Sequence, residues 1–335
     1  MTEFAGLTRR QQIERLQRLA EEALHLYGFE GASLSLLRLS QFFNTSFRVM
    51  APDGSHYVLR IHRPSSNPER KRVKIVSELW WMNGVHEDLR ISTPRPVRTL
   101  SGEEVVRVGA PGVPEPRFCV LFHFVEGSFL QRGQRPQHLE QVGVLAARLH
   151  DYSAQLTVPP WFTRNIVDRA DEAFEDSVAG LLEREWSGDV ADTIRAAFPR
   201  FRDVQRRLGS GRDVFGVIHA DIHHWNYLFD RGQIRLIDFD DSGWGHYLYD
   251  LAVTGQQIAR LPQGPALWNA LLTGYRRVRQ LSAEHEATIE AFRVLREIQD
   301  LHFDLSQRED PTRAWLLPRI EWIVAEVQRY LGSGR

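Results

Sequence analysis

A run of polar side chains lies between two apolar segments in the stretch VIHADIHHWNYLFD, from Val217 to Asp230. The stretch contains three histidines, two aspartates and an asparagine, and the apolar residues at its two ends favour short buried strands. Polar groups at the edge of a buried region need hydrogen-bond partners or a binding role. The pattern therefore predicts a polar loop held between two short strands.

The composition limits the classes of protein to consider. The chain has 335 residues, of which 42% are hydrophobic, enough for a large core and two domains. With 42 basic and 43 acidic residues, no overall charge favours nucleic acid or a membrane surface. The single cysteine, Cys119, permits no internal disulfide, and the sequence shows neither a signal-peptide core nor an 18-residue apolar span. We expect a cytoplasmic protein without nucleic-acid or membrane partners, and the composition leaves its oligomeric state open.

The first part of the chain alternates between helical and β-rich patterns. Thr8 and Gln11 have the spacing of a capping box, and apolar residues recur at helical intervals from there to Gly28. Three β-rich runs follow between residues 33 and 125, and turns rich in glycine and proline interrupt the second run at 52–54 and the third at 109–116. One helix, over about 68–85, is expected between the second run and the third.

From Gly127 onward the periodicity is mostly helical, and strand signals are confined to VFGVIHA, YLFD and IRLIDF. The fold class predicted from this order is α+β. We predict a helical extension, then a small lobe with an antiparallel sheet and one main helix, then a larger and mostly helical lobe. The expected boundaries of these three parts are 1–30, 31–124 and 125–335.

Two motifs in the helical part suggest a chemistry. His219, Asp221 and Asn226 are spaced as H-x-D-x-x-x-x-N, and Asp238 ends a β-rich run twelve residues after Asn226. In phosphoryl transfer, one aspartate accepts the proton of the attacking hydroxyl, while an asparagine and a second aspartate bind the metal ions that bridge the ATP phosphates. The first motif alone would match by chance in roughly a few per cent of chains this long. The second motif, in the required order, makes chance an unlikely explanation.

The sequence VIHADIHHWNYLFD...IRLIDFDDSGWGHYLYDLA resembles the aminoglycoside phosphotransferase superfamily, the small-molecule kinases that include choline and homoserine kinase-like enzymes. The resemblance extends from about Ser33 to the C-terminus, and it implies a protein-kinase-like bilobal fold. It also implies ATP and Mg²⁺ as cofactors. The roles that it implies are Asp221 as catalytic base, His219 as the catalytic-loop histidine that braces it, Asn226 and Asp238 as magnesium ligands, and Asp250 as a support below the loop.

The resemblance also implies a nucleotide site in the small lobe. Arg60, in YVLRIHR, stands where kinases usually have a lysine, and its planar, permanently charged side chain can bind phosphate oxygens. Glu78 matches the helix glutamate that would hold Arg60; the alternative is a surface Glu78 paired with Lys74. Further contacts are expected from the loop LSQFFNTSFRV and from the hinge VLFHFVEG. The residues expected there are Asn44, Thr45, Ser46, Phe122, His123 and Phe124.

The acceptor is expected to be a small molecule with a hydroxyl group. Only eleven residues separate Asp238 from Asp250, too few for a long activation segment that could bind a peptide. Acidic residues follow Asp238 and recur on one stripe of the run REIQDLHFDL, beside aromatic residues. Such groups suit a cation, so we predict an amino alcohol or a hydroxy amino acid, although a solvated acidic face is the simpler explanation of the stripe. The candidate acceptor residues are Asp240, Asp241, Trp244, Asp300 and Asp304.

Three other functions remain open at the level of sequence. One is a protein Ser/Thr kinase of the same superfamily, and another is a non-catalytic pseudokinase. The third is a metal-dependent hydrolase, which would explain the histidines of the polar stretch but not Asp238 or Arg60. Its ligands would be His219, Asp221, His223 and His224.

Overall fold

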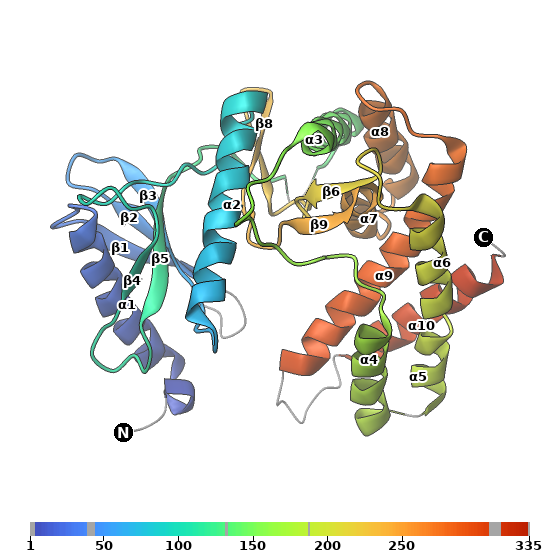
Figure 1. Cartoon of the computed structure of the whole chain (residues 1–335), viewed down its shortest axis with the longest axis horizontal. Helices are drawn as coiled ribbons and strands as arrows, with labels where there is room; N and C mark the ends of the chain where they lie inside the picture. The colour runs from blue at the N-terminus through green and yellow to red at the C-terminus, as the bar shows by residue number, and fades with distance from the viewer. Residues whose placement is uncertain (1–3, 39–43, 131–132, 187, 308–315, 334–335) are drawn as a thin grey trace. The chain divides into compact units, whose positions relative to one another are not determined.

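The computed structural model describes residues 4–38, 44–130, 133–186, 188–307 and 316–333. The chain forms two compact units, of which the first comprises residues 1–126 with 159–163 and the second comprises 127–158 with 164–335 (Figure 1). None of the helices in the described ranges has the length and hydropathy that crossing a membrane requires.

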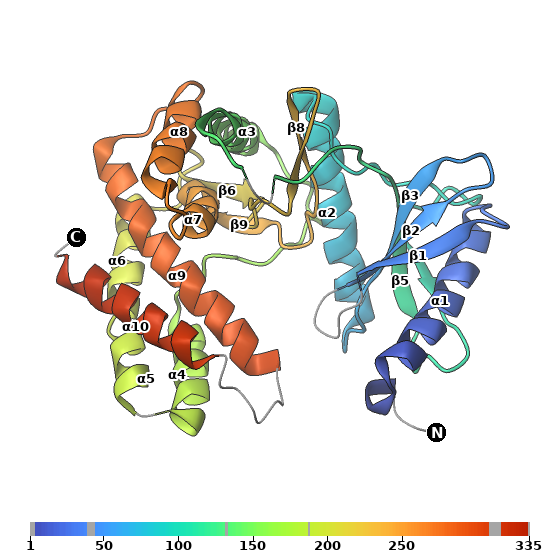
Figure 2. The same cartoon turned by 180° about the vertical axis from the view of Figure 1, so that it is seen from behind.

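The first unit is built on a five-stranded antiparallel sheet with the strand order β1-β2-β3-β5-β4. The strands are β1 (Ser33–Arg38), β2 (Thr45–Met50), β3 (His56–Ile61), β4 (Val106–Val108) and β5 (Arg117–His123). Two α-helices cover opposite faces of this sheet, as Figures 1 and 2 show from two sides. They are α1 (Arg9–Leu26), which follows the short 3-10 helix η1 (Phe4–Gly6), and α2 (Pro68–Leu89).

The two faces of the sheet differ in what they carry. Phe47, Leu59 and Leu121 belong to the core that the sheet shares with α1, where Leu19 is fully buried. Because successive side chains of a strand point to opposite faces, Arg60 must point away from this core, toward the face of α2. The pleat of β3 therefore presents a charged side chain to α2.

Local signals set the ends of both helices. The capping box expected at the start of α1 is confirmed, because the Thr8 hydroxyl accepts a hydrogen bond from Gln11 N–H and the Gln11 side chain accepts one from Thr8 N–H. Helix α2 begins after Asn67, whose side chain accepts a hydrogen bond from Arg70 N–H. It ends at Arg90, which has a left-handed backbone with φ of 54°.

A short segment from later in the chain, residues 159–163, also belongs to the first unit. The Thr163 N–H donates to the Ser77 hydroxyl of α2 at 2.8 Å. The rings of Trp161 and Phe162 meet the Trp80 ring edge-on, with centroids 6.2 and 5.5 Å away. The sequence pattern did not predict this return of the chain to α2.

The second unit consists mostly of helices, with two antiparallel pairs of short strands. The helices are α3 (Pro136–Gln155), α4 (Glu172–Glu185), α5 (Gly188–Arg195), α6 (Phe198–Leu208), α7 (Tyr247–Ile258), α8 (Gly264–Arg276), α9 (Ala283–Gln307) and α10 (Leu317–Gly332). One strand pair is β6 (Phe215–Ile218) with β9 (Gly243–His246), and the other is β7 (Tyr227–Asp230) with β8 (Gln233–Leu236).

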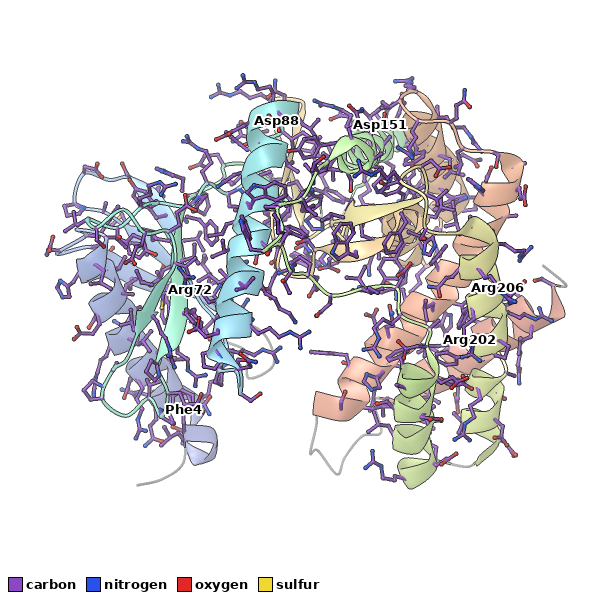
Figure 3. The ribbon with its side chains drawn as sticks, in the orientation of Figure 1. Phe4, Arg72, Asp88, Asp151, Arg202 and Arg206 are labelled. Atoms are coloured by element: carbon purple, nitrogen blue, oxygen red, sulfur yellow. The ribbon has the colours of Figure 1, made fainter. Side chains whose placement is uncertain are left out.

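Close helix packing and ion pairs hold this unit together. A Cβ atom at Gly143 of α3 would come within 2.0 Å of the Leu271 carbonyl oxygen of α8, so only glycine permits this approach of the two backbones. Two of the side chains labelled in Figure 3 join elements by ion pairs. Asp151 of α3 accepts a hydrogen bond from Arg279 at 2.6 Å, and Arg202 of α6 donates to Glu175 of α4 at 2.6 Å.

The predicted polar loop lies where the sequence places it, over residues 219–226 between β6 and β7. Strands β7 and β8 form a hairpin whose two turn residues, Arg231 and Gly232, both have positive φ, as a tight two-residue turn requires. The chain then leaves β8 and reaches Asp238. The hairpin thereby brings the second motif back beside the first. The Ile237 N–H, next to Asp238, donates to the Asn226 carbonyl at 2.8 Å.

Candidate active site

The polar loop is held by an aspartate of the following helix. The two carboxylate oxygens of Asp250, at the start of α7, accept hydrogen bonds from the backbone N–H groups of Ala220 at 2.6 Å and His219 at 3.2 Å. Ala220 has φ of 66°, a conformation that costs an ordinary residue about 1–2 kcal/mol. The fully buried Asp250 therefore offsets backbone strain at the start of the loop, in the position that the resemblance implies.

His219 is fixed in one neutral form by its hydrogen bonds. Its Nδ1 accepts the Asp221 N–H at 3.3 Å, and its Nε2 faces the Ile237 carbonyl at 3.2 Å, which can only accept. The proton must therefore be on Nε2. Burial lowers the pKa of His219, which keeps the ring neutral. The histidine braces the loop and links it to the residue before Asp238.

Three side chains hold the carboxylate of Asp221. Arg296 of α9 donates to its Oδ1 at 3.0 Å, and the Asn226 amide nitrogen donates to its Oδ2 at 2.6 Å. The His223 Nδ1 accepts the Trp225 N–H at 3.2 Å, so its Nε2 carries a proton and points to Oδ2 of Asp221 at 3.2 Å. The carboxylate of the predicted base is thus fixed in orientation from two sides.

These donors also set the charge of Asp221. Burial alone raises its pKa, but the hydrogen bond from His223 and the charge of Arg296 outweigh burial and hold the pKa well below its usual range. The carboxylate is therefore ionised at neutral pH and is a weak base. Such a group suits a reaction in which the hydroxyl is oriented early and loses its proton late.

The residues expected to bind a metal fit that role. Since the Asn226 amide nitrogen donates to Asp221, the amide oxygen is the atom that could bind a cation. Asp238 has φ of 61°, a left-handed conformation that is uncommon for aspartate and is often found at functional positions. One carboxylate and one amide oxygen are few ligands, but Mg²⁺ in such sites also takes phosphate oxygens and water.

Within the ranges that the structure describes, the ligands of a hydrolytic metal centre do not come together. The described residues contain no group of three histidine, cysteine, aspartate or glutamate side chains placed to hold a metal ion. Both ring nitrogens of His219 are used in the hydrogen bonds described above, and His224 has its ring packed beside Trp225 at 5.1 Å. These contacts remove the alternative that took the four side chains as metal ligands.

In the first unit, the structure brings Arg60 and Glu78 together. The Arg60 Nη2 lies 2.5 Å from the Glu78 Oε1, and both side chains are buried. The guanidinium carbon of Arg60 also lies 4.9 Å from the centre of the Phe122 ring. Glu78 is therefore a buried partner of Arg60 and not the surface residue of the alternative interpretation.

The loop before β2 is described only from Asn44 onward, so the earlier part of the predicted nucleotide loop lies outside the described residues. Asn44 is buried and its side-chain oxygen accepts the Arg63 N–H at 3.3 Å. Thr45 shares its sheet face with the core residue Phe47, whereas Ser46 pairs with Arg60 and shares the face of α2. Among the three residues, the side chain of Ser46 is best placed to act together with Arg60.

Backbone N–H groups of the predicted hinge, residues 122–124, are already hydrogen-bonded within the protein. The N–H of His123 donates to the Arg95 carbonyl at 2.9 Å, and the N–H of Phe124 donates to the His56 carbonyl at 3.1 Å. Phe122 is buried beneath Arg60. A donor for the edge of a nucleotide base must therefore come from beyond Phe124, while carbonyl oxygens of 122–124 can still accept.

The acidic stripe of α9 is neutralised within the protein. Asp300 pairs with Arg296 at 3.0 Å and accepts a hydrogen bond from Gln256 at 2.9 Å, and Asp304 pairs with Arg319. Paired carboxylates of this kind have little net attraction left for a cationic substrate. The geometry therefore gives Asp300 and Asp304 a structural role and does not support the predicted acceptor contact.

Asp241 and Trp244 follow Asp238 in the chain and differ from Asp300 and Asp304 in their surroundings. The side chain of Asp241 is exposed, and within the described residues it makes no hydrogen bond or ion pair. Partial desolvation, together with the negative charges of Asp221 and Asp240, raises its pKa to about 7. A cation placed there would relieve this repulsion. Trp244 lies in β9, with its ring parallel to the Phe215 ring at 6.3 Å.

Sequence reasoning missed two arginines of this site. Arg296 stands four residues before Asp300, a spacing that signals an ion pair on a helix but does not reveal the contact with Asp221. The Arg164 side chain donates to the backbone carbonyls of Phe239 at 3.4 Å and Ser242 at 2.5 Å, and also to that of Asp240. It therefore fixes the turn after Asp238, and nothing in its sequence context indicates this.

The chain is similar to known proteins in sequence and in fold. A sequence model described as the phosphotransferase enzyme family matches residues 36–290. Homoserine kinase from Pseudomonas aeruginosa is 28% identical over 216 residues, which cover 60% of this chain and 61% of that protein. A solved microcompartment-associated aminopropanol kinase is 27% identical with a TM-score of 0.78, over 94% of this chain and 97% of that one. A solved amicoumacin kinase, in complex with AMP-PNP, Ca²⁺ and Ami, is 21% identical with a TM-score of 0.76, over 95% of this chain and 96% of that one.

Proposed function

This chain belongs to the phosphotransferase enzyme family and is a small-molecule kinase, and from that premise we propose that it transfers the γ-phosphoryl group of ATP to a hydroxyl group of an amino alcohol or hydroxy amino acid. The observation that carries the proposal is the carboxylate of Asp221, held ionised by three donors on a loop that also presents Asn226. Such a carboxylate can orient a hydroxyl group and take its proton.

The cofactors that we propose are ATP and Mg²⁺. Arg60 supports the phosphate contact, because Glu78 and Phe122 fix its guanidinium on the α2 face of the sheet. Asn226 and Asp238 would hold the metal, which when bound would neutralise charge on the transferring phosphate. The amicoumacin kinase structure contains an ATP analogue and a divalent cation, in keeping with this choice.

Each proposed residue acts at a stated atom. The Asp221 carboxylate accepts the proton of the acceptor hydroxyl as its oxygen attacks phosphorus, and the bond between the γ-phosphorus and the bridging oxygen breaks. His219 holds the backbone of Asp221, and Asn226 holds its Oδ2. The backbone of the loop is fixed in turn by Asp250. The rate then depends on how well these groups are placed before the reaction begins.

The amine of the acceptor is proposed from charge and from the relatives. Asp241 is an exposed carboxylate surrounded by other carboxylates, a suitable partner for an ammonium group. Aminopropanol is an amino alcohol and homoserine is a hydroxy amino acid, and these are the acceptors named for two similar proteins. The structure disfavours a peptide acceptor, because β9 and the start of α7 occupy the segment between Asp238 and Asp250.

The test is a coupled assay with Mg-ATP and paired acceptors, namely aminopropanol and homoserine, each with a free and with an acetylated amine. We expect turnover with the free amines and at least a ~10-fold lower kcat/KM with the acetylated forms, since about 1.4 kcal/mol of charge pairing corresponds to that ratio. Asp241→Asn should remove this preference while leaving ATP binding intact. Equal rates for both members of every pair would rule out recognition of the amine.

A further inference from the structure

Arg296 joins helix α9 to the loop that carries Asp221. Its Nη2 donates to Asp221 Oδ1 at 3.0 Å, and its Nη1 lies 3.3 Å from the Ala220 carbonyl and 3.4 Å from the Tyr249 hydroxyl. Its Nε lies 3.0 Å from Asp300 Oδ1. A single side chain of α9 therefore reaches the backbone and the carboxylate of the catalytic loop together.

The guanidinium is itself held by its neighbours. Asp300 pairs with Arg296 and lies 3.8 Å from Arg319 of α10, and Arg319 also pairs with Asp304. The contacts thus join five side chains of alternating charge, which run from the loop through α9 to α10 and back to α9: Asp221, Arg296, Asp300, Arg319 and Asp304. Gln256 of α7 adds a hydrogen bond to Asp300 at 2.9 Å. Side chains of α7, α9 and α10 thus hold the guanidinium of Arg296 in one position.

We propose that Arg296 is a positioning residue for phosphoryl transfer, which fixes the plane of the Asp221 carboxylate, and that Asp300 fixes Arg296. This inference rests on the proposed role of Asp221 as the base. A carboxylate can turn about its Cβ–Cγ bond, and here opposite donors stop it, with Arg296 at Oδ1 and with Asn226 and His223 at Oδ2. Without Arg296, the donors at Oδ2 remain but the carboxylate can turn away from the acceptor hydroxyl.

The expected effect is on turnover. Arg296→Met should lower kcat by about 10- to 100-fold, a part of the ~10²–10⁴-fold that a general base supplies, and leave the KM values for ATP and acceptor within about 3-fold. Arg296→Lys should recover part of kcat, because an ammonium group can pair with one of the two carboxylates. It cannot contact Asp221, Asp300 and the Ala220 carbonyl together. Asp300→Asn should lower kcat less than Arg296→Met, since it loosens Arg296 without removing it.

Helix α9 offers a matched control in Arg293, three residues before Arg296. Arg293 is similarly buried and also bridges two carboxylates, Glu290 and Glu326, but makes no described contact with the catalytic loop. Arg293→Met should lower the melting temperature about as much as Arg296→Met and leave kcat unchanged. A fall in kcat for both variants would assign the effect to the integrity of α9 and overturn the proposal.

The decisive measurement is a double-variant cycle with Asp221→Asn. The reaction followed is Mg-ATP with aminopropanol, or ATP hydrolysis by water if the parent protein does not use aminopropanol. In the Asp221→Asn background, Arg296→Met should cause no further loss, because its effect passes through Asp221. Independent, multiplying losses would overturn the positioning role. Unchanged turnover in Asp221→Asn alone would instead refute the proposed base, which separates that failure from this one.

Discussion

At the scale of single residues, Arg60 shows how an arginine is held at a position where we expected the lysine of other kinases. A lysine would place one ammonium group on a flexible stem, whereas the arginine has a planar group that Glu78 and the ring of Phe122 hold from two directions. The buried Glu78 compensates the charge of Arg60 in turn. The guanidinium of Arg60 is therefore fixed in position on the α2 face of the sheet.

This geometry predicts a selective loss of phosphate affinity. Arg60→Ala should weaken ATP by about 10- to 100-fold, since hydrogen bonds to charged groups contribute about 1.5–3 kcal/mol, and should leave adenosine within about 2-fold. Calorimetric titration with both ligands measures the difference. Arg107 lies on the edge strand β4, which pairs with β5, and its side chain is exposed. The control variant is therefore Arg107→Ala. Parallel losses for ATP and adenosine would indicate damage to the sheet.

A second prediction at this scale concerns Asp238. Asp238→Asn retains the size of the side chain but removes the negative charge, so nucleotide binding should lose its dependence on Mg²⁺. We expect the affinity for ATP with Mg²⁺ to fall to the value without Mg²⁺, with little change in melting temperature. Titrations at several Mg²⁺ concentrations test this. Parent-like magnesium dependence in Asp238→Asn would exclude Asp238 as a ligand.

The sequence predicted some residues of the site and not others for a physical reason. His219, Asp221 and Asn226 lie on one loop, and their spacing is visible because the loop itself sets their geometry. Arg296 and Arg164 reach the site from distant parts of the chain, so tertiary packing alone brings them there. The ion pair of Asp300 with Arg296 could be suspected from the helical spacing, but the further contact of Asp300 with Arg319 of α10 depends on tertiary packing.

At the scale of elements, helix α7 supports the polar loop of residues 219–226. Asp250 accepts two backbone N–H groups of the loop, and the Thr254 hydroxyl donates to the Ile222 carbonyl at 2.7 Å. His150 of α3 adds a contact to Asp250 at 3.1 Å. The loop is consequently held by a packed helix, which explains how Ala220 keeps its strained backbone.

Removing the carboxylate of Asp250 should lower the free energy of unfolding. Asp250→Ala leaves two buried N–H groups and the ring of His150 without their acceptor, at a cost of about 3–5 kcal/mol. Chemical denaturation measures this loss. Thr254→Val removes one hydrogen bond from the same helix and should cost only about 1 kcal/mol. Equal stabilities for the two variants would contradict the central role of Asp250.

The main elements could be predicted from local pattern, since the first helix with its cap and the helix after Asn67 follow capping and periodicity signals. The return of residues 159–163 to α2 could not. It depends on edge-on contacts of Trp161 and Phe162 with Trp80 and on one hydrogen bond to Ser77, none of which has a sequence signature.

At the scale of the whole molecule, buried histidines make stability depend on pH. Burial lowers the pKa of both His150 and His219 in the folded protein. As the pH falls below about 6.5, the unfolded chain takes up protons that the folded protein does not, so stability is present above that pH and is lost below it. Each histidine contributes a slope of at most ~1.4 kcal/mol per pH unit.

We therefore expect the two histidines to lower the free energy of unfolding from pH 7 to pH 5, while Asp241, whose pKa is raised to about 7 in the folded protein, offsets about one proton of this slope. His150→Gln can keep the hydrogen bonds to Asp250 and Tyr275 but cannot take up a proton, so it should reduce the slope by about one proton. Urea denaturation across this range measures the slope. The exposed His25 gives the control His25→Gln, and a parent-like slope in His150→Gln would refute the assignment.

The return of residues 159–163 to α2 affects how this protein can be recombined with its relatives. A chimaera that exchanges only residues 1–126 would place a foreign α2 against the native Trp161 and Phe162, and the hydrogen bond from Thr163 would depend on a serine at position 77. An exchange that also carries residues 159–163 would keep these contacts as a set. Exchange of the first unit as a whole thus requires three crossover points in the gene, after residue 126, before residue 159 and after residue 163.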